Sequence, residues 1–176
     1  DVYPCGPDPS NGTVTISGDI AVPGTLTFGD TFRIEYALCD EGFGEVIDGA
    51  IDLTVGDFSG NLLEYTYLLA MDAVVTDLQV ISETDTVTGN GDATITLDTL
   101  LTPYVEAGVS GTQMTMDANA SSETLSNYST SQTYDGNQDP AEYTLAAAGE
   151  LDSTRLAGAV RYATGPDFAR LMVKWH

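Results

Sequence analysis

The chain is short of basic residues, with five Lys and Arg against 27 Asp and Glu and a formal net charge of −22. Proteins that bind nucleic acid or anionic lipid contact phosphate through clustered Lys and Arg, so this composition excludes both kinds of partner. The sequence also has no run of about 20 apolar residues, the length that a membrane-spanning helix needs. We therefore expect no nucleic acid partner and no transmembrane segment.

Histidine is almost missing as well, because His176 is the only one and is the last residue. Ser-His-Asp and Cys-His catalytic systems need an imidazole held in one place, which a terminal residue rarely supplies. The glycine motifs that bind phosphates or dinucleotides are absent too. We predict no catalytic residue, no organic cofactor and no enzymatic activity.

There are two cysteines, Cys5 and Cys39, and no Cys-x-x-Cys motif. An even count favours one disulfide, with two unpaired buried thiols as the alternative. The chain begins at Asp1 rather than Met, which is typical of an exported protein after removal of its signal peptide, or of a trimmed chain. These features predict an extracellular, cell-surface or periplasmic location, and a lipid anchor before Asp1 stays open.

Alternation of apolar and polar residues with a period of two is the main pattern of the sequence. In residues 31–39, Phe32, Ile34, Tyr36 and Leu38 alternate with Arg33 and Glu35 and are expected to share one face. Such alternation predicts antiparallel strands with one dry face and one wet face. We therefore expect an all-β fold, an antiparallel meander of long strands forming a rolled sheet, an open barrel or a sandwich, with at most short helical turns. Similar runs occupy 12–18, 49–55, 91–99 and 155–164, and turn signals between runs include Gly42 to Gly44, Gly56-Asp57, Asn90-Gly91 and Gly136-Asn137.

A chain of 176 residues fits one domain, residues 1–176. Some segments allow two interpretations. Residues 61–75 are either a long strand or a helix capped by Asn61, and residues 98–109 have room for a helical turn that Pro103 interrupts. Residues 119–140 are rich in Ser, Thr and Asn, and form either a long polar loop or one more polar hairpin.

Charge is unevenly placed along the chain. Residues 1–150 hold 25 acids and one base, whereas residues 151–176 hold two acids and four bases. Within the basic end, residues 165–176, Leu171, Val173 and Trp175 alternate with polar residues and predict an amphipathic terminal strand. That strand either completes its own sheet or is donated to the sheet edge of another copy, so a second copy is a candidate protein partner.

Calcium is the metal that this composition favours, because hard cations bind oxygen ligands in flexible loops. Asp135, Asn137 and Asp139 have the spacing of the first half of a calcium loop, and Glu142 is a further candidate ligand. The later positions do not match an EF-hand, and an ordinary polar turn is the alternative. Three glycosylation sequons also occur, at Asn11, Asn119 and Asn127.

Two patches carry a resemblance. Residues 36–55, YALCDEGFGEVIDGAIDLTV, place a strand ending in Cys before an acidic glycine turn and a second strand. Together with residues 148–164, AGELDSTRLAGAVRYAT, they resemble β-rich secreted proteins and lipoproteins of Gram-negative bacteria, a loose group mostly without assigned function. The resemblance implies export and an all-β fold, and it transfers no catalytic residue.

These observations predict a non-catalytic extracytoplasmic β domain that acts in cell-surface structure or binding, as a self-assembling subunit if its terminal strand is donated. The first alternative is a carrier of lipid or another apolar ligand in an open barrel, with Leu69, Met114 and Met116 among the candidate lining residues. The second alternative is a carbohydrate-active enzyme with paired carboxylates. Its candidate sugar platform would come from Tyr65, Tyr67, Tyr104, Tyr128 and Tyr134.

Overall fold

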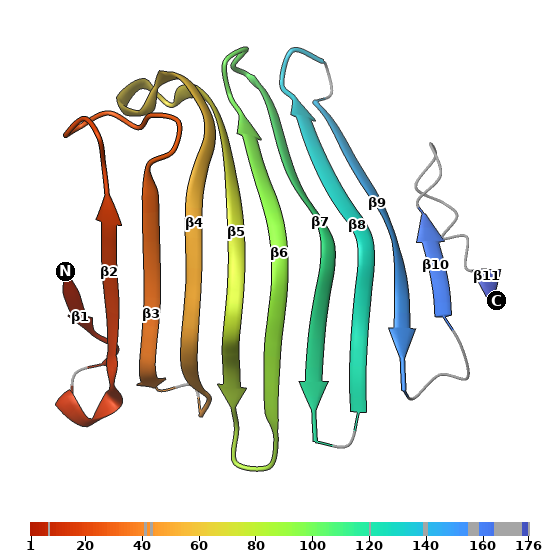
Figure 1. Cartoon of the computed structure of the whole chain (residues 1–176). Helices are drawn as coiled ribbons and strands as arrows, with labels where there is room; N and C mark the ends of the chain where they lie inside the picture. The colour runs from red at the N-terminus through yellow and green to blue at the C-terminus, as the bar shows by residue number, and fades with distance from the viewer. Residues whose placement is uncertain are drawn as a thin grey trace.

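The computed structural model describes residues 1–6, 8–40, 42, 44–119, 121–138, 141–154, 159–163 and 174–175. The strands form one 11-stranded sheet in which each strand pairs antiparallel with the next strand along the chain (Figure 1). In chain order they are β1 (Val2–Pro4), β2 (Thr13–Asp19), β3 (Thr31–Asp40), β4 (Val46–Asn61), β5 (Thr66–Ile81), β6 (Thr86–Asp98), β7 (Tyr104–Ala118), β8 (Ser121–Asp135), β9 (Glu142–Ser153), β10 (Ala159–Ala163) and β11 (Lys174–Trp175).

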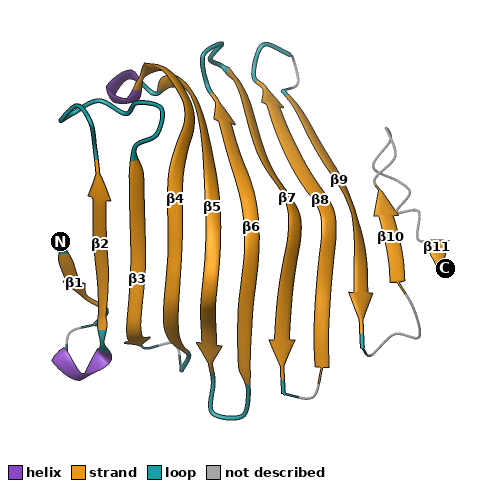
Figure 2. Ribbon diagram, in the orientation of Figure 1, coloured by secondary structure: helices purple, strands orange, loops and turns teal. Residues whose placement is uncertain are grey.

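The sheet is a single layer, and no helix or second sheet covers either face of the described strands (Figure 2). The two helical elements of this part of the chain are short 3-10 turns, η1 (Pro9–Asn11) and η2 (Leu62–Glu64). None of the helices in the described ranges has the length and apolarity needed to cross a bilayer. The predicted all-β antiparallel meander with short helical turns is confirmed, and its sheet is open, with β1 and β11 at its edges.

The segment 61–75 combines both of its interpretations. Asn61 caps η2, and its side chain accepts a hydrogen bond from the backbone N–H of Leu63 at 3.0 Å. Tyr65 then adopts a left-handed conformation with φ of 53°, and β5 begins at Thr66. The cap signal therefore produced one turn, and the Thr- and Val-containing sequence after it formed the strand that its β propensity favours.

The structure also decides between the two interpretations of residues 119–140 and tests two of the predicted turns. Residues 121–135 form β8, which is paired on both sides, so the polar segment 119–140 contains a hairpin strand. The turns predicted at Gly56-Asp57 and Asn90-Gly91 are wrong, because both pairs lie inside strands β4 and β6. Glycine within a strand marks a bulge or a close backbone approach as well as a turn. A Cβ at Gly91 would lie 2.8 Å from the Cα of Met114.

Irregularities of the ladder line up in a band across the sheet. Register shifts occur at Tyr36/Cys39 between β3 and β4, at Val75/Leu78 between β5 and β6, and at Ser126/Ser129 between β8 and β9. Each shift lies beside a residue in the left-handed region, namely Leu38, Asp77 and Asn127. We call this band the bulge band. Because a bulge adds one residue to one strand, it decides which side chains face each side beyond it.

Few residues are fully enclosed. Among the described residues the buried apolar ones are Cys39, Ala50, Val55, Ala73 and Tyr128. The chain exposes 11136 Å², whereas a compact protein of this mass exposes about 8,200 Å². One layer of strands cannot enclose a core, so most apolar side chains are only half-buried, by their neighbours on the same face.

Candidate functional site

One face of the sheet is apolar across nearly its whole width. Direct cross-strand partners share a face, so the register places one unbroken row of apolar positions across β2 to β10. We call it the apolar row: Ile16, Ile34, Ile51, Val75, Gly91, Met114, Leu125, Leu151 and Val160. None of its nine members is polar. The face that carries this row is called the apolar face below.

Neighbouring rows extend the apolar face in both directions. Met71, Ile95 and Val109 are partners on β5, β6 and β7, on one side of the bulge band. Ile47, Val80 and Val87 are partners on β4, β5 and β6, on the other side. These two rows lie on the same face as the apolar row, because the bulges offset the alternation where it would otherwise reverse.

Several members of this face remain open to solvent. Ile16 is 40% exposed, Val109 37%, Met116 38% and Leu145 47%. A continuous apolar surface of this extent is unusual on a soluble monomer and typically marks an interaction site. It is therefore the candidate functional site.

Carboxylates are concentrated on the opposite face. A polar row there comprises Thr31, Thr54, Asp72, Thr94, Ser110 and Ser129, on β3 to β8. Within it the hydroxyl of Thr94 donates to Asp72 Oδ1 at 2.7 Å. By register, Glu123 is the one carboxylate that the described strands β2 to β9 place on the apolar face, and Ser153 Oγ donates to it at 3.3 Å. The polar row's side of the sheet, with the other strand carboxylates, is called the acidic face.

Large side chains cover glycines on the apolar face. Phe32 is paired with Gly18 and Tyr128 with Gly111, in each case on adjacent strands. A Cβ at Gly18 would lie 3.0 Å from Cδ1 of Phe32, and a Cβ at Gly111 would overlap the Tyr128 hydroxyl. These rings lie across the neighbouring strand and bury apolar surface without a second layer.

Side chains from neighbouring strands secure the bulge band. Asp92 Oδ1 accepts from the Thr112 hydroxyl at 2.6 Å and from Gln113 N–H at 3.1 Å, and Asp92 Oδ2 accepts from Thr112 N–H at 2.9 Å. These bonds, the Thr112 hydroxyl first, hold the pKa of Asp92 below its ordinary value of 3.8. Asn90 Oδ1 accepts from the bulged Asp77 N–H at 2.8 Å in the same way. The band is thus a hydrogen-bonded feature of the sheet.

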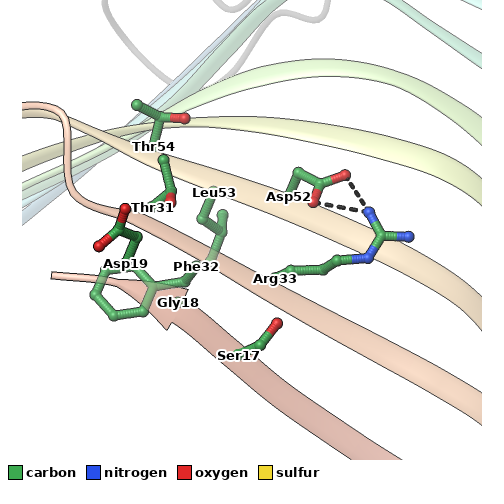
Figure 3. Close-up of a pocket in the computed structure, with 9 residues that line it drawn as sticks. All are labelled: Ser17, Gly18, Asp19, Thr31, Phe32, Arg33, Asp52, Leu53 and Thr54. Atoms are coloured by element: carbon green, nitrogen blue, oxygen red, sulfur yellow. Dashed lines mark hydrogen bonds and ion pairs between the residues drawn. The ribbon is translucent and has the colours of Figure 1, made fainter.

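A shallow hollow of about 510 Å³ lies where β2, β3 and β4 run side by side (Figure 3). It contains Arg33, the one Lys or Arg whose side chain the structure describes. Arg33 Nη1 donates to both carboxylate oxygens of Asp52, at 2.8 and 2.6 Å, and this partner raises the pKa of Arg33. Because its charge is already paired, Arg33 offers no free site for an anion.

The disulfide prediction is confirmed. Cys5 and Cys39 are bonded with Cα atoms 5.3 Å apart, and Cys39 is completely buried. The bond ties the segment after β1 to the end of β3. A disulfide is consistent with an oxidising extracellular or periplasmic compartment.

The candidate calcium loop is only partly described, because Asp139 lies outside the described residues. Asp135 Oδ1 accepts from the backbone N–H of Asn137 at 2.9 Å, and Oδ2 accepts from Gln138 Nε2 at 3.2 Å. These bonds lower the pKa of Asp135, the backbone N–H of Asn137 contributing most. No cluster of three or more metal-ligating side chains occurs in the ranges the structure covers. Calcium binding at 135–139 stays a prediction.

The candidate assembly strand is also only partly described. Trp175 belongs to β11, which pairs with β10 of the same chain through Val160↔Trp175 and Arg161↔Lys174. The described pairing is therefore the one expected for a self-completing strand. Leu171 and Val173 lie outside the described residues, and donation of the strand to another copy stays a prediction.

The candidate sugar-platform tyrosines do not meet. Tyr65 lies at the η2–β5 junction and is 77% exposed, whereas Tyr128 is buried on β8. Tyr104 is on the acidic face, where its hydroxyl donates to Glu106 at 3.4 Å. Tyr134 instead contacts Tyr143, with ring centroids 4.8 Å apart.

Sequence reasoning identified many apolar faces strand by strand but missed the continuity of the apolar row. That row depends on register, and Leu125 lies in the segment 119–140 that was predicted as a polar loop or hairpin, while no strand was predicted around Met114. Comparison of the chain with protein-family models, curated proteins and solved structures finds no match to any of them.

Proposed function

We propose that the protein is a non-catalytic extracytoplasmic β domain that acts in surface structure or binding by covering its apolar face with a partner. The observation that carries this proposal is the apolar row, nine apolar positions side by side with no charge among them. Burial of such a surface is the main driving force for protein association.

The distribution of charge supports the same function. With a net charge of −22 the chain is strongly self-repelling, yet the carboxylates of its strands are collected on the acidic face. An acidic and hydroxylated face stays hydrated while the other face is covered. The disulfide supports an oxidising location.

A second candidate function is binding of an apolar small molecule. A hollow of about 290 Å³ on β6 to β9 is bordered by Ile95, Leu97, Val109 and Leu145, among others. Small-molecule sites are usually deeper and bury most of the ligand. We therefore place this function second.

Three described methionines, Met71, Met114 and Met116, lie on the apolar face and provide a native probe of it. Their oxidation by hydrogen peroxide is to be measured in the dilute isolated chain and in protein taken intact from its native compartment. We expect Met114 and Met116 to oxidise readily in the former and to be protected in the latter. Oxidation in the native material as rapid as that of an unprotected monomer would contradict the proposed function.

A further inference from the structure

The structure points to a specific occupant for the apolar face. We propose that it packs against the apolar face of a second copy of this chain, giving a two-layer homodimer with both acidic faces outward. This inference rests on the proposed function, because it names the partner of that face.

The amount of open surface fits such a dimer. The chain exposes 11136 Å², about 2,900 Å² more than a compact protein of its mass. Strands of about 13 residues and eight strands between β2 and β9 give a footprint of about 1,500 Å² for one face. Two copies would then bury about 3,000 Å² in total, within the range of obligate homodimers.

Charge selects this arrangement over the others that two sheets could adopt. Two acidic faces would repel each other, and an acidic face against an apolar one would leave carboxylates buried without partners. When two apolar faces pack together, Glu123 is the one strand carboxylate that becomes buried. Its side chain already accepts a hydrogen bond from Ser153 Oγ at 3.3 Å. The carboxylates of the two acidic faces would lie on opposite sides of the double layer.

The geometry is self-complementary. Two sheets stack face to face about 10 Å apart with their strands roughly aligned. A two-fold axis through such a stack uses the same patch on both copies, so it closes as a dimer. The row of Ile16, Ile34 and Ile51 on one copy would supply side chains to the layer that an isolated sheet lacks.

The first test is sedimentation of the oxidised full chain across protein concentrations from about 1 to about 100 µM. Salt at about 0.15 M is needed to screen the charge of the chain. We expect a monomer–dimer equilibrium or a constant dimer. A monomer at every concentration overturns the inference.

A matched pair of variants tests the face. Val109→Lys places a charge on the apolar face, where Val109 is 37% exposed, and Val74→Lys places the same charge on the acidic face, where Val74 is 51% exposed. Val74 has Asp52 and Asp92 as its direct cross-strand partners, so the added Lys is tolerated there. We expect Val109→Lys to weaken dimerisation about 100-fold or more and Val74→Lys to leave it unchanged.

Methionine oxidation separates face-to-face packing from joining at the sheet edges. A stacked dimer protects Met114 and Met116 as protein concentration rises, whereas dimers joined through edge strands leave them accessible. Rates that stay the same while the protein passes from monomer to dimer overturn the stacked arrangement. For a constant dimer, rates equal to those of monomeric Val109→Lys overturn it. Circular dichroism and thiol titration of Val109→Lys establish that its sheet and disulfide are intact.

Failure of this inference is distinguishable from failure of the proposed function. A monomer that binds phosphatidylcholine vesicles, with binding lost in Val109→Lys and kept in Val74→Lys, would show that the face takes lipid and would overturn the homodimer alone. A monomer whose methionines are equally reactive in isolated and native material would contradict both proposals.

Discussion

The ring of Tyr128 on β8 occupies the space that a Cβ of Gly111 on β7 would need. The Tyr128 hydroxyl reaches past Gly111 and donates to the carbonyl oxygen of Asp92 on β6 at 2.6 Å. One side chain thus spans three strands at the bulge band, and Tyr128 is the only buried aromatic residue among those described. In a single-layer sheet such a bridge replaces part of the packing that a second layer would provide.

Gly111→Ala should therefore destabilise the protein by about 1–3 kcal/mol, because the new methyl group would overlap both the Asp92 carbonyl oxygen and the Tyr128 ring that bonds to it. The matched control is Gly108→Ala on the same strand, where a Cβ meets the movable Thr96 Oγ1 at 2.7 Å. Tyr128→Phe removes only the hydrogen bond and should cost about 1 kcal/mol. Urea denaturation measures all three, and equal midpoints for the two glycine variants would contradict the bridge.

Acid should destabilise the fold through the hydrogen-bonded carboxylates. The pKa of Asp30 is lowered because Ala21 N–H donates to it at 2.9 Å and Thr27 donates through both its N–H and its hydroxyl. A lowered folded-state pKa gives stability that is complete above the unfolded value and is lost as pH falls through the folded value. For Asp30 and Asp92 that loss begins near the ordinary value of 3.8 and continues below it.

Asp30→Asn should flatten the pH dependence of the urea midpoint below pH 3.8, because the amide stays neutral at every pH. Unfolding curves recorded at steps of pH provide the measurement. The explanation fails if the urea midpoint of the Asp30 variant falls with decreasing pH as steeply as that of the wild-type protein.

Reduction of the Cys5–Cys39 disulfide should lower the free energy of unfolding by about 4 kcal/mol, because the bond closes a loop between residues separated by 34 positions. Urea denaturation with and without a phosphine reductant measures the loss. The Cys5→Ala/Cys39→Ala variant is the control, since its free energy of unfolding should equal that of the reduced protein and should not change when reductant is added.

Leu38→Asn should stabilise the protein by about 0.5–1 kcal/mol. Leu38 is 60% exposed and has φ of 48° in the bulge band, a conformation that Asn accepts at lower cost than Leu. The exposed side chain gives up little packing when replaced. A lower urea midpoint for this variant would show that contacts of the Leu38 side chain stabilise the protein by more than Asn gains from adopting the left-handed backbone conformation at lower cost.

Calcium binding at residues 135–139, if the loop is a site, requires the charge of Asp135. Asp135→Asn keeps an oxygen that accepts from the Asn137 N–H, so the turn survives while affinity for calcium drops at least about tenfold. Calorimetric titration with calcium chloride measures this. Absence of binding heat in the wild-type protein would reduce the segment to a polar turn.

Local patterns in the sequence predicted much of the fold. The alternation correctly predicted a strand with Phe32, Ile34 and Tyr36 on one apolar face, because strand side chains alternate whatever the neighbours are. It was wrong for Leu38, because the bulge there puts Cys39 in register with Ile47 instead. Cys5 and Cys39 predicted the disulfide. Residues 121–135 were harder, since Thr130 and Gln132 occupy the apolar face there and weaken the alternation signal.

The Asn90-Gly91 pair shows what a local sequence pattern does not predict. Its composition indicates a turn, yet Asn90 accepts a hydrogen bond from Asp77 on β5 and Gly91 makes room for Met114 on β7. Both roles depend on residues more than ten positions away, which a local pattern does not register.

The sequence by itself determined the all-β class, the amphipathic character of the strands whose alternation is regular, and the excess of acid, because these follow from composition and a period of two. Only the tertiary structure decided that the meander stays a single open layer, that the bulge band keeps the apolar rows on its two sides on the same face, and that nine apolar positions form one row. Register, bulges and sheet closure depend on pairings between distant strands, and so does the apolar face on which the proposed function rests.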